Sequence, residues 1–229
     1  MRIHNVIIVL GSEREAVNLA PLVLAMRNQP DLRPVVVAAG AGQNAYENVL
    51  SLFDITSDFT VNIGGKNPQS SKYRTKSSDL DDLLYEQPDL VLVQAGTDTA
   101  VATTLDAFVH RVPVMHVGDA LPTDGTDQWP AELDGRLATR RCALHLVSTP
   151  LGAQALLDGG VPPDSIVCTG ARAVDSLLPP QNSPITQSVR LLVELDRRGP
   201  AAWRALGAIR YFLGIGPRPV GFLAGTAAA

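Results

Sequence analysis

Short apolar runs alternate with longer segments of helical period along most of this chain. Runs rich in Val, Ile and Leu are typical of buried strands, and the segments between them carry apolar residues on one helix face. We predict strands at Val6–Leu10, Pro34–Ala38, Phe59–Ile63, Asp89–Gln94, Pro113–Val117, Leu144–Ser148 and Ile166–Thr169. We predict helices at Arg14–Arg27, Ala45–Phe53, Ser78–Tyr85, Ala100–Val109, Pro130–Cys142, Pro150–Asp158 and Ala173–Leu178. This order predicts a Rossmann-like, three-layer α/β fold with a mostly parallel sheet of about seven strands.

The regular alternation ends at a proline-rich stretch that follows Leu178. We therefore expect a Rossmann-like lobe at 1–178, a linker at 179–185, and a helical extension with a tail at 186–229. Within the extension the apolar spacing predicts two helices, at Thr186–Arg197 and Ala201–Leu213. The second helix would either cross back onto the first lobe or cover a surface that a missing lobe leaves open.

Composition narrows the classes of function. The chain has 229 residues, a net charge of −4 and no block of Lys or Arg, so we expect no nucleic-acid partner. No apolar run approaches the roughly 18 residues of a membrane span, and no secretory signal is recognisable at the start. Cys142 and Cys168 lie far apart and form no CxxC motif, so we expect reduced thiols in a cytoplasmic protein.

The turn after the first predicted strand carries the most informative residues. Gly11 and Ser12 end a strand and open a helix, an arrangement that presents backbone N–H groups and a helix dipole to an anion. Glu13 and Glu15 in the same turn would repel a phosphate, whereas Arg14 could supply a cation. The basic stretch at 64–78 leaves two interpretations open, a solvated loop or an electrostatic lid over an anionic ligand.

Five motifs follow one another in a recognisable order. They are Gly11–Pro21 (GSEREAVNLAP), Val91–Thr99 (VLVQAGTDT), His116–Thr123 (HVGDALPT), Trp129–Gly135 (WPAELDG) and Thr169–Asp175 (TGARAVD). They resemble the G-T-R-P-E-A-I-K-M-A-P, V-L-V-H-G-D-T-T-T, H-V-E-A-G-L-R-T, W-P-E-E-x-N-R and T-G-N-x-x-x-D motifs of the non-hydrolysing UDP-N-acetylglucosamine 2-epimerase family. The resemblance runs from residue 5 to about residue 178, and nothing after Pro184 resembles the family's second lobe.

The resemblance implies the first lobe of a two-lobed GT-B fold. It also implies a UDP-GlcNAc-like ligand and a homodimer or a complex with a chain that supplies the second lobe. We expect no cofactor, and no metal either, because the spacing of His116, Asp119, Asp124 and Asp127 matches neither an EF-hand loop nor a zinc motif. Family members interconvert UDP-GlcNAc and UDP-ManNAc by eliminating UDP to a glycal-like intermediate and adding it back. This chemistry needs positioned carboxylates for proton transfer and cationic groups for the diphosphate.

Several positions depart from the family motifs. Gly96 and Gly118 stand where the motifs have acids, while Glu13 and Asn18 stand where they have the phosphate-binding Arg and Lys. We predict Glu132, Asp98 and Asp119 as candidate catalytic residues. We predict the ligand-binding residues Gly11, Ser12, Arg14, Gln94, Thr97 and His116. Thr97 and Thr99 are further expected to cap the helix near Ala100.

Three functional hypotheses follow from the motifs and their departures. The first is a divergent UDP-GlcNAc 2-epimerase-like protein whose own activity is impaired by the replaced acids and cations. The second is a non-catalytic protein that binds a nucleotide sugar or regulates a complete enzyme. The third is one subunit of a split, glycosyltransferase-like enzyme. The sequence does not identify the ligand, the pathway, the oligomeric state or the role of 186–229.

Overall fold

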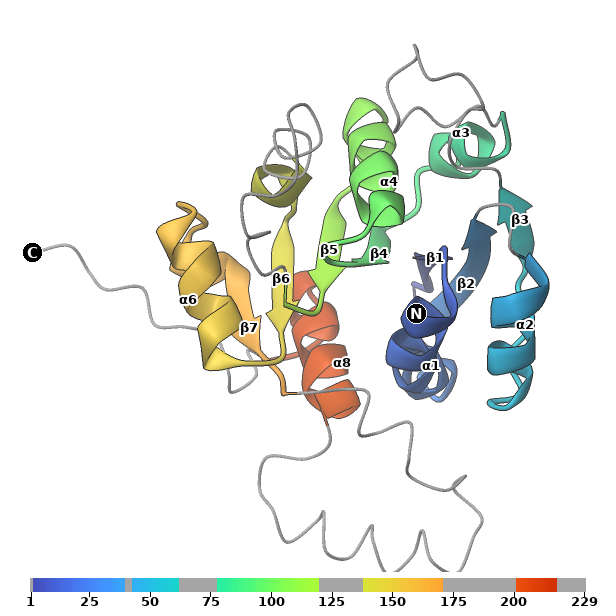
Figure 1. Ribbon diagram of the computed structural model, residues 1–229, viewed down its shortest axis with the longest axis horizontal. Coiled ribbons are helices and arrows are strands. Elements are labelled where there is room, and N and C mark those ends of the chain that lie inside the picture. The colour runs from blue at the N-terminus through green and yellow to red at the C-terminus, as the bar shows by residue number, and fades with distance from the viewer. Residues whose placement is uncertain (1, 40–42, 62–77, 120–137, 171–200, 218–229) are drawn as a thin grey trace, which may run out of the picture.

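One sheet of seven parallel strands forms the centre of the protein, in the order β3-β2-β1-β4-β5-β6-β7 (Figure 1). The computed structural model describes residues 2–39, 43–61, 78–119, 138–170 and 201–217. The strands are β1 (His4–Leu10), β2 (Leu32–Ala39), β3 (Phe59–Val61), β4 (Leu90–Gln94), β5 (Val114–Val117), β6 (Leu144–Val147) and β7 (Ile166–Cys168). All seven predicted strands are confirmed, with ends that differ by up to two residues.

The predicted helices in the described ranges are confirmed as well. They are α1 (Glu13–Arg27), α2 (Gln43–Ser51), α3 (Ser78–Tyr85), α4 (Asp98–Val109), α6 (Pro150–Asp158) and α8 (Ala201–Phe212). Of the helix predicted at Pro130–Cys142, residues 138–141 are described and helical. The helices predicted at 173–178 and 186–197, most of the basic stretch at 64–78 and the linker lie outside the described residues. The division into lobe, linker and extension therefore stays a prediction.

Alternate residues of the central strands enter two different hydrophobic clusters, one on each face of the sheet. Val6, Ile8 and Leu10 of β1 pack in the cluster that contains α1, α2 and α8 residues. Ile7 and Val9 pack in the cluster that contains residues of α3 and α4. A parallel sheet that is covered on both faces needs apolar side chains on both, which explains the unbroken apolar run of β1. The three-layer α/β prediction is confirmed.

The C-terminal helix α8 is part of this core. Its apolar face buries Ala205, Leu206, Ala208 and Ile209 completely or nearly so, in the same cluster as α1 (Figure 1). Arg210 fixes the end of the helix, because its guanidinium donates hydrogen bonds of 2.6 Å to Asp31 and 3.1 Å to Gln29. The helix thus packs on the first lobe, as one of the two sequence interpretations expected.

Within the described ranges, each helix is too short or too polar to cross a bilayer.

Candidate functional site

The order of the strands predicts a ligand site at the carboxyl ends of β1 and β4. The chain leaves β1 toward β2 on one side, whereas β4 and the later strands lie on the other side. In open α/β sheets a ligand binds outside the carboxyl ends of the strands at such a switch point. Gly11 and Ser12 follow β1 here, and the segment from Ala95 to Thr97 follows β4. The turn that the sequence singled out therefore lies at the switch point.

The first turn of α1 uses a carboxylate from its own helix to bind its backbone. Ser12 is the N-cap, and its hydroxyl accepts a 3.3 Å hydrogen bond from the backbone N–H of Glu15. The Glu15 carboxylate in turn accepts a hydrogen bond from the backbone N–H of Gly11. Glu15 is only 2% exposed, and burial raises its pKa although bonds to Gly11, Thr97 and Ser12 oppose the rise. The N–H group that the sequence assigns to an anion is thus occupied by Glu15.

The neighbouring charged residues of this turn have a different environment. Glu13 and Arg14 are both exposed on the outer side of α1. Gly11 itself is held against the start of α4, because a Cβ atom there would come within 2.0 Å of the Thr99 hydroxyl oxygen. A larger residue at position 11 would therefore push α1 and α4 apart.

A pair of side-chain amides connects α1 to the end of β4. The side-chain NH2 group of Asn18 donates a 3.0 Å hydrogen bond to the side-chain oxygen of Gln94, Oε1. Gln94 is 9% exposed at the last position of β4, and Asn18 is half-buried on the face of α1 that meets it. Gln94, a predicted ligand-binding residue, is thus in direct contact with Asn18, which stands where the family motif has a lysine.

Thr97 and Asp98 form the start of α4. Thr97 is the N-cap, as predicted. Its hydroxyl accepts a 3.1 Å hydrogen bond from the backbone N–H of Ala100 and donates a 3.1 Å hydrogen bond to the backbone carbonyl oxygen of Gln94. Thr99, also predicted as a cap, lies inside the first turn. Asp98 is exposed and opens the helix, where its charge suits the helix dipole. Gly96, two residues before Asp98, has a φ angle of +76°, a backbone conformation that favours glycine.

Asp119 lies at a different place on the carboxyl edge, after β5. Its carboxylate accepts a 2.6 Å hydrogen bond from Ser148 N–H, one of 3.3 Å from Thr149 N–H and one of 2.9 Å from the Thr149 hydroxyl. Thr149 is the N-cap of α6. Asp119 therefore ties the end of β5 to the start of α6, and the preceding residue, Gly118, has φ +108°.

His116 lies inside the protein, on the face of the sheet that α4 covers. It is 3% exposed, and its Nε2 atom is 3.1 Å from the Thr104 hydroxyl oxygen. The ring of His145 packs edge-on against it, with centroids 5.4 Å apart. Burial lowers the pKa of His116 to about 3, with a smaller contribution from His145, and lowers the pKa of His145 to about 4. Both rings are therefore neutral at pH 7.

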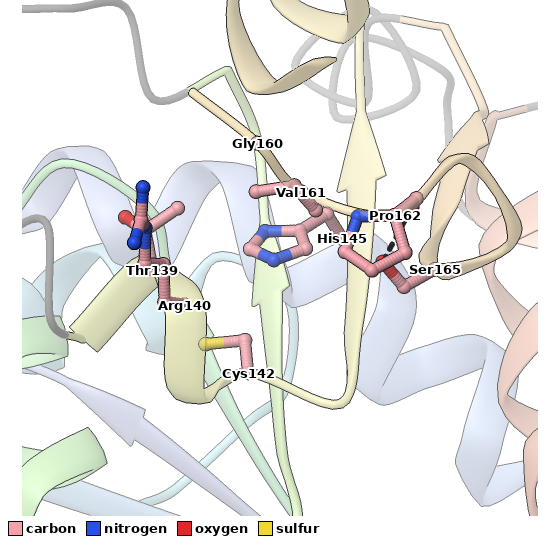
Figure 2. A pocket seen from close by; sticks show the side chains of 8 residues that line it. All are labelled: Thr139, Arg140, Cys142, His145, Gly160, Val161, Pro162 and Ser165. Atoms are coloured by element: carbon pink, nitrogen blue, oxygen red, sulfur yellow. Dashed lines mark hydrogen bonds between the residues drawn. The ribbon is translucent and has the colours of Figure 1, made fainter. Parts of the chain in front are cut away.

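A small hollow of about 280 Å³ lies at the amino ends of β6 and β7 (Figure 2). Its lining residues are Thr139, Arg140, Cys142, His145, Gly160, Val161, Pro162 and Ser165. Burial raises the pKa of the Cys142 thiol, so this thiol stays protonated and unreactive. The amino ends of parallel strands lie at the edge opposite to the switch point, so this hollow is separate from the Gly11 and Thr97 turns. Its lining residue His145 packs against His116.

The structure thus groups some of the predicted residues and separates others. Gly11, Ser12 and Thr97 meet around Glu15, and Gln94 joins them through Thr97 and Asn18. Arg14 and Asp98 are exposed at the first turns of α1 and α4, while Asp119 and His116 belong to β5 and its surroundings. Glu132 lies outside the described residues. The roles of all these residues toward a ligand stay predictions.

Three contact residues were not singled out as site residues by the sequence. From the sequence, Glu15 is expected to repel a phosphate, although Ser12 and Glu15 have the spacing of a capping box, S-x-x-E, which is the signal for its bond to the backbone. Thr104 and His145, which surround His116, carry no local sequence signal. Among the described residues, no three His, Cys, Asp or Glu side chains gather in a way that could hold a metal ion.

Comparison with known proteins identifies the family to which this fold belongs. Residues 24–198 match the family model described as UDP-N-acetylglucosamine 2-epimerase. The UDP-N-acetylglucosamine 2-epimerase of Escherichia coli K12 is 34% identical over 177 residues, which are 76% of this chain and 47% of that protein. The corresponding protein of Neisseria meningitidis serogroup A is 31% identical over 177 residues, 76% of this chain and 48% of its own length.

Solved structures agree with the sequence matches. A crystal structure of UDP-N-acetylglucosamine 2-epimerase has a TM-score of 0.66 and 30% identity, and the match covers 82% of this chain and 55% of that one. The N. meningitidis enzyme bound to UDP-GlcNAc has a TM-score of 0.67 and 27% identity, with 84% and 53% covered. The chain belongs to the UDP-N-acetylglucosamine 2-epimerase family, which confirms the resemblance. It spans about half the length of the curated relatives it matches.

Proposed function

We propose that this chain binds a UDP-GlcNAc-like nucleotide sugar at the β1/β4 switch point and does not epimerise it. The ligand class is supported by the N. meningitidis relative, whose structure contains UDP-GlcNAc. The location is supported by the strand order, because the Gly11 turn and the Thr97 turn both follow strands at the switch point, where open α/β sheets bind ligands. The chain keeps the scaffold of the family at this edge.

One observation carries the second half of the proposal. Asp119, the carboxylate next to a vacated acid position, accepts three hydrogen bonds from Ser148 and Thr149 at the start of α6. A general base must have its oxygen within hydrogen-bond reach of the proton it removes, and these bonds direct the Asp119 oxygens toward the start of α6. The two aligned positions themselves, Gly96 and Gly118, have no side chain that could move a proton.

Nuclear magnetic resonance in D2O tests both halves of the proposal in one sample. We expect saturation transfer from the protein to UDP-GlcNAc, and no deuterium at C2 above the protein-free rate. Deuterium incorporation or formation of UDP-ManNAc would disprove the lack of turnover. Absence of saturation transfer would disprove ligand binding.

Matched variants identify the source of any deuterium that does enter. Asp119→Asn, Asp98→Asn and Glu132→Gln each remove one candidate proton carrier while changing the side-chain shape very little. We expect all three to behave like the parent chain in this assay. Loss of incorporation in a single variant would assign the proton transfer to that carboxylate and overturn the proposal.

A second candidate function is favoured by the length of the match. Because the chain spans about half of its relatives, a second lobe on the same protein or on another chain would complete the cleft. In this hypothesis the first lobe alone binds the nucleotide sugar weakly and gains affinity when the second lobe is added.

A cytoplasmic setting and a homodimer are also part of the proposal. Cys142 and Cys168 form no disulfide, which is consistent with a cytoplasmic setting. Sedimentation velocity would measure the oligomeric state.

A further inference from the structure

The polar side chains that meet at the β1/β4 switch point have an unusual balance of charge. They comprise the buried carboxylate of Glu15, the amides of Asn18 and Gln94, and the hydroxyl of Thr97. None of these four groups is a cation. A phosphate needs cations or N–H donors, and the backbone N–H of Gly11 is already bonded to Glu15. These four side chains therefore stabilise a diphosphate poorly, and the cation of this turn, Arg14, is exposed at the first turn of α1.

The amide pair offers a different chemistry. A side-chain amide has two N–H donors and an oxygen with two lone pairs. The bond between Asn18 and Gln94 uses one donor of the first and the oxygen of the second. The oxygen of Asn18 and the NH2 group of Gln94 lie outside this bond, so the pair combines an acceptor and a donor. Reversing both amides would leave the same combination.

A hydroxyl group matches this combination and a phosphate does not. Each sugar hydroxyl both donates and accepts, so two neighbouring hydroxyls can bond to an amide oxygen and an amide NH2 together. Phosphate oxygens at neutral pH mainly accept, and they would face the Asn18 oxygen and the Glu15 carboxylate without a matching donor. The same features that weaken diphosphate binding thus favour an uncharged polyhydroxyl group.

We propose that Asn18 and Gln94 select the sugar part of the nucleotide sugar at this switch point, and that the diphosphate contributes little to binding there. This inference rests on the proposed function, since it assigns a preference to the same site. The amides fix the hydroxyls of the sugar ring, and Glu15 keeps the first turn of α1 closed to phosphate. The ligand preference is therefore set by neutral hydrogen bonding rather than by charge.

Isothermal titration of the full chain with UDP-GlcNAc and with UDP measures this preference. We expect UDP-GlcNAc to bind at least about tenfold more tightly than UDP, because only UDP-GlcNAc has the hydroxyls of the N-acetylglucosamine ring, whereas the ribose hydroxyls are common to both. Equal affinities for UDP and UDP-GlcNAc would overturn the inference while leaving nucleotide-sugar binding intact. Lack of binding by either ligand would overturn the proposed function together with the inference.

Two variants test the assignment to the amide pair. Asn18→Lys places a cation beside the switch point, so we expect UDP to bind about tenfold more tightly, with a gain that shrinks as salt increases. Gln94→Leu removes the donor, so we expect the ratio of the two affinities to fall about tenfold. Unchanged affinities in Asn18→Lys would show that a ligand does not reach the amide pair, and would disprove the inference.

A matched control separates local charge from net charge. Asn48→Lys makes the same change on the exposed side of α2, and we expect it to leave both affinities unchanged. An equal gain for UDP in both lysine variants would mean that only the overall charge matters, and would also disprove the assignment. Thermal unfolding of each variant checks that the fold is kept. If Gln94→Leu fails to fold, the two lysine variants still decide the question.

Discussion

The face covered by α8 and the carboxyl edge at β1 and β4 are held together by different forces. On the α8 face, Leu206 and Ile209 pack against the core that α1 shares, and the Arg210–Asp31 ion pair lies at its rim. At the carboxyl edge, the contacts are polar: Glu15 to Gly11, and Asn18 to Gln94. Helix α1 takes part in both regions: its apolar residues pack in the core with α8, and Glu15 and Asn18 make the polar contacts at the carboxyl edge.

The difference shows where stability and ligand preference can change independently. Apolar burial supplies most of the free energy of folding, so the α8 face should dominate stability. Polar contacts contribute less net free energy but fix the charge and the hydrogen-bonding groups that a ligand meets. Substitutions on the two sides should therefore have separate consequences, and four predictions follow in order of size.

The largest effect is expected on the α8 face. Leu206→Ala removes a side chain that is 2% exposed, and we expect the free energy of unfolding to fall by about 2–5 kcal/mol because a cavity remains. Leu52→Ala is the matched control, since Leu52 is 79% exposed and should change stability by less than about 0.5 kcal/mol. Urea unfolding measures both. Equal effects would mean that α8 does not pack as described.

The buried histidines should make stability sensitive to acid. His116 and His145 have folded pKa values of about 3 and 4, below the value of about 6.5 in an unfolded chain, so the unfolded state binds protons first as pH falls. The two neutral rings therefore contribute fully to the free energy of unfolding above about pH 6.5. Below that pH the contribution falls, by about 2 kcal/mol per histidine between pH 7 and pH 5. Urea unfolding across this range should show the slope.

One histidine variant checks the source of that slope. His145→Gln cannot take up a proton, so we expect a shallower dependence of the unfolding free energy on pH below 6.5. The same variant measured at pH 8, where both rings are neutral, gives the cost of the substitution itself. An unchanged slope would place the proton uptake elsewhere in the chain.

An intermediate effect is expected at the Gly11 turn. Gly11→Ala would bring a Cβ atom within 2.0 Å of the Thr99 hydroxyl oxygen, and we expect a loss of about 1–3 kcal/mol from the resulting strain. Thr99→Ala removes that oxygen, so the double variant should lose less than the sum of the two single variants. Thermal unfolding of the four proteins measures the coupling. Strict additivity would contradict the close approach.

The smallest effect compares two acids on the carboxyl edge. Asp119→Ala removes three hydrogen bonds at the start of α6, and we expect a loss of about 1–2 kcal/mol. Asp98→Ala removes an exposed acid from the first turn of α4, so its loss should be below about 1 kcal/mol. Urea unfolding ranks the two. The reverse order would mean that Asp119 is less engaged than its contacts indicate.

Several features of the fold could be predicted from local patterns alone. The apolar runs of β1 and β4 and the helical spacing between them predicted these elements to within two residues. The cap of α4 at Thr97 was also predictable, because the residue preceding a helix needs an oxygen that accepts a backbone N–H. Such features depend on neighbours within a few positions along the chain.

The face of His116 and the partners of the carboxylates could not be predicted in this way. A parallel strand buried on both faces is apolar throughout, so its sequence does not mark which side chains point toward α4. Asp119 meets Ser148 and Thr149 only because β5 and β6 lie side by side. Contacts between residues so far apart depend on strand order.

The sequence by itself determined the seven strands, the helices between them and the family to which they belong. These properties follow from short-range periodicity and from motifs read in order. The tertiary structure decided that Glu15 binds the backbone N–H of Gly11, that Asn18 meets Gln94, and that α8 completes the core. These contacts join residues that only the packing of helices on the sheet brings together.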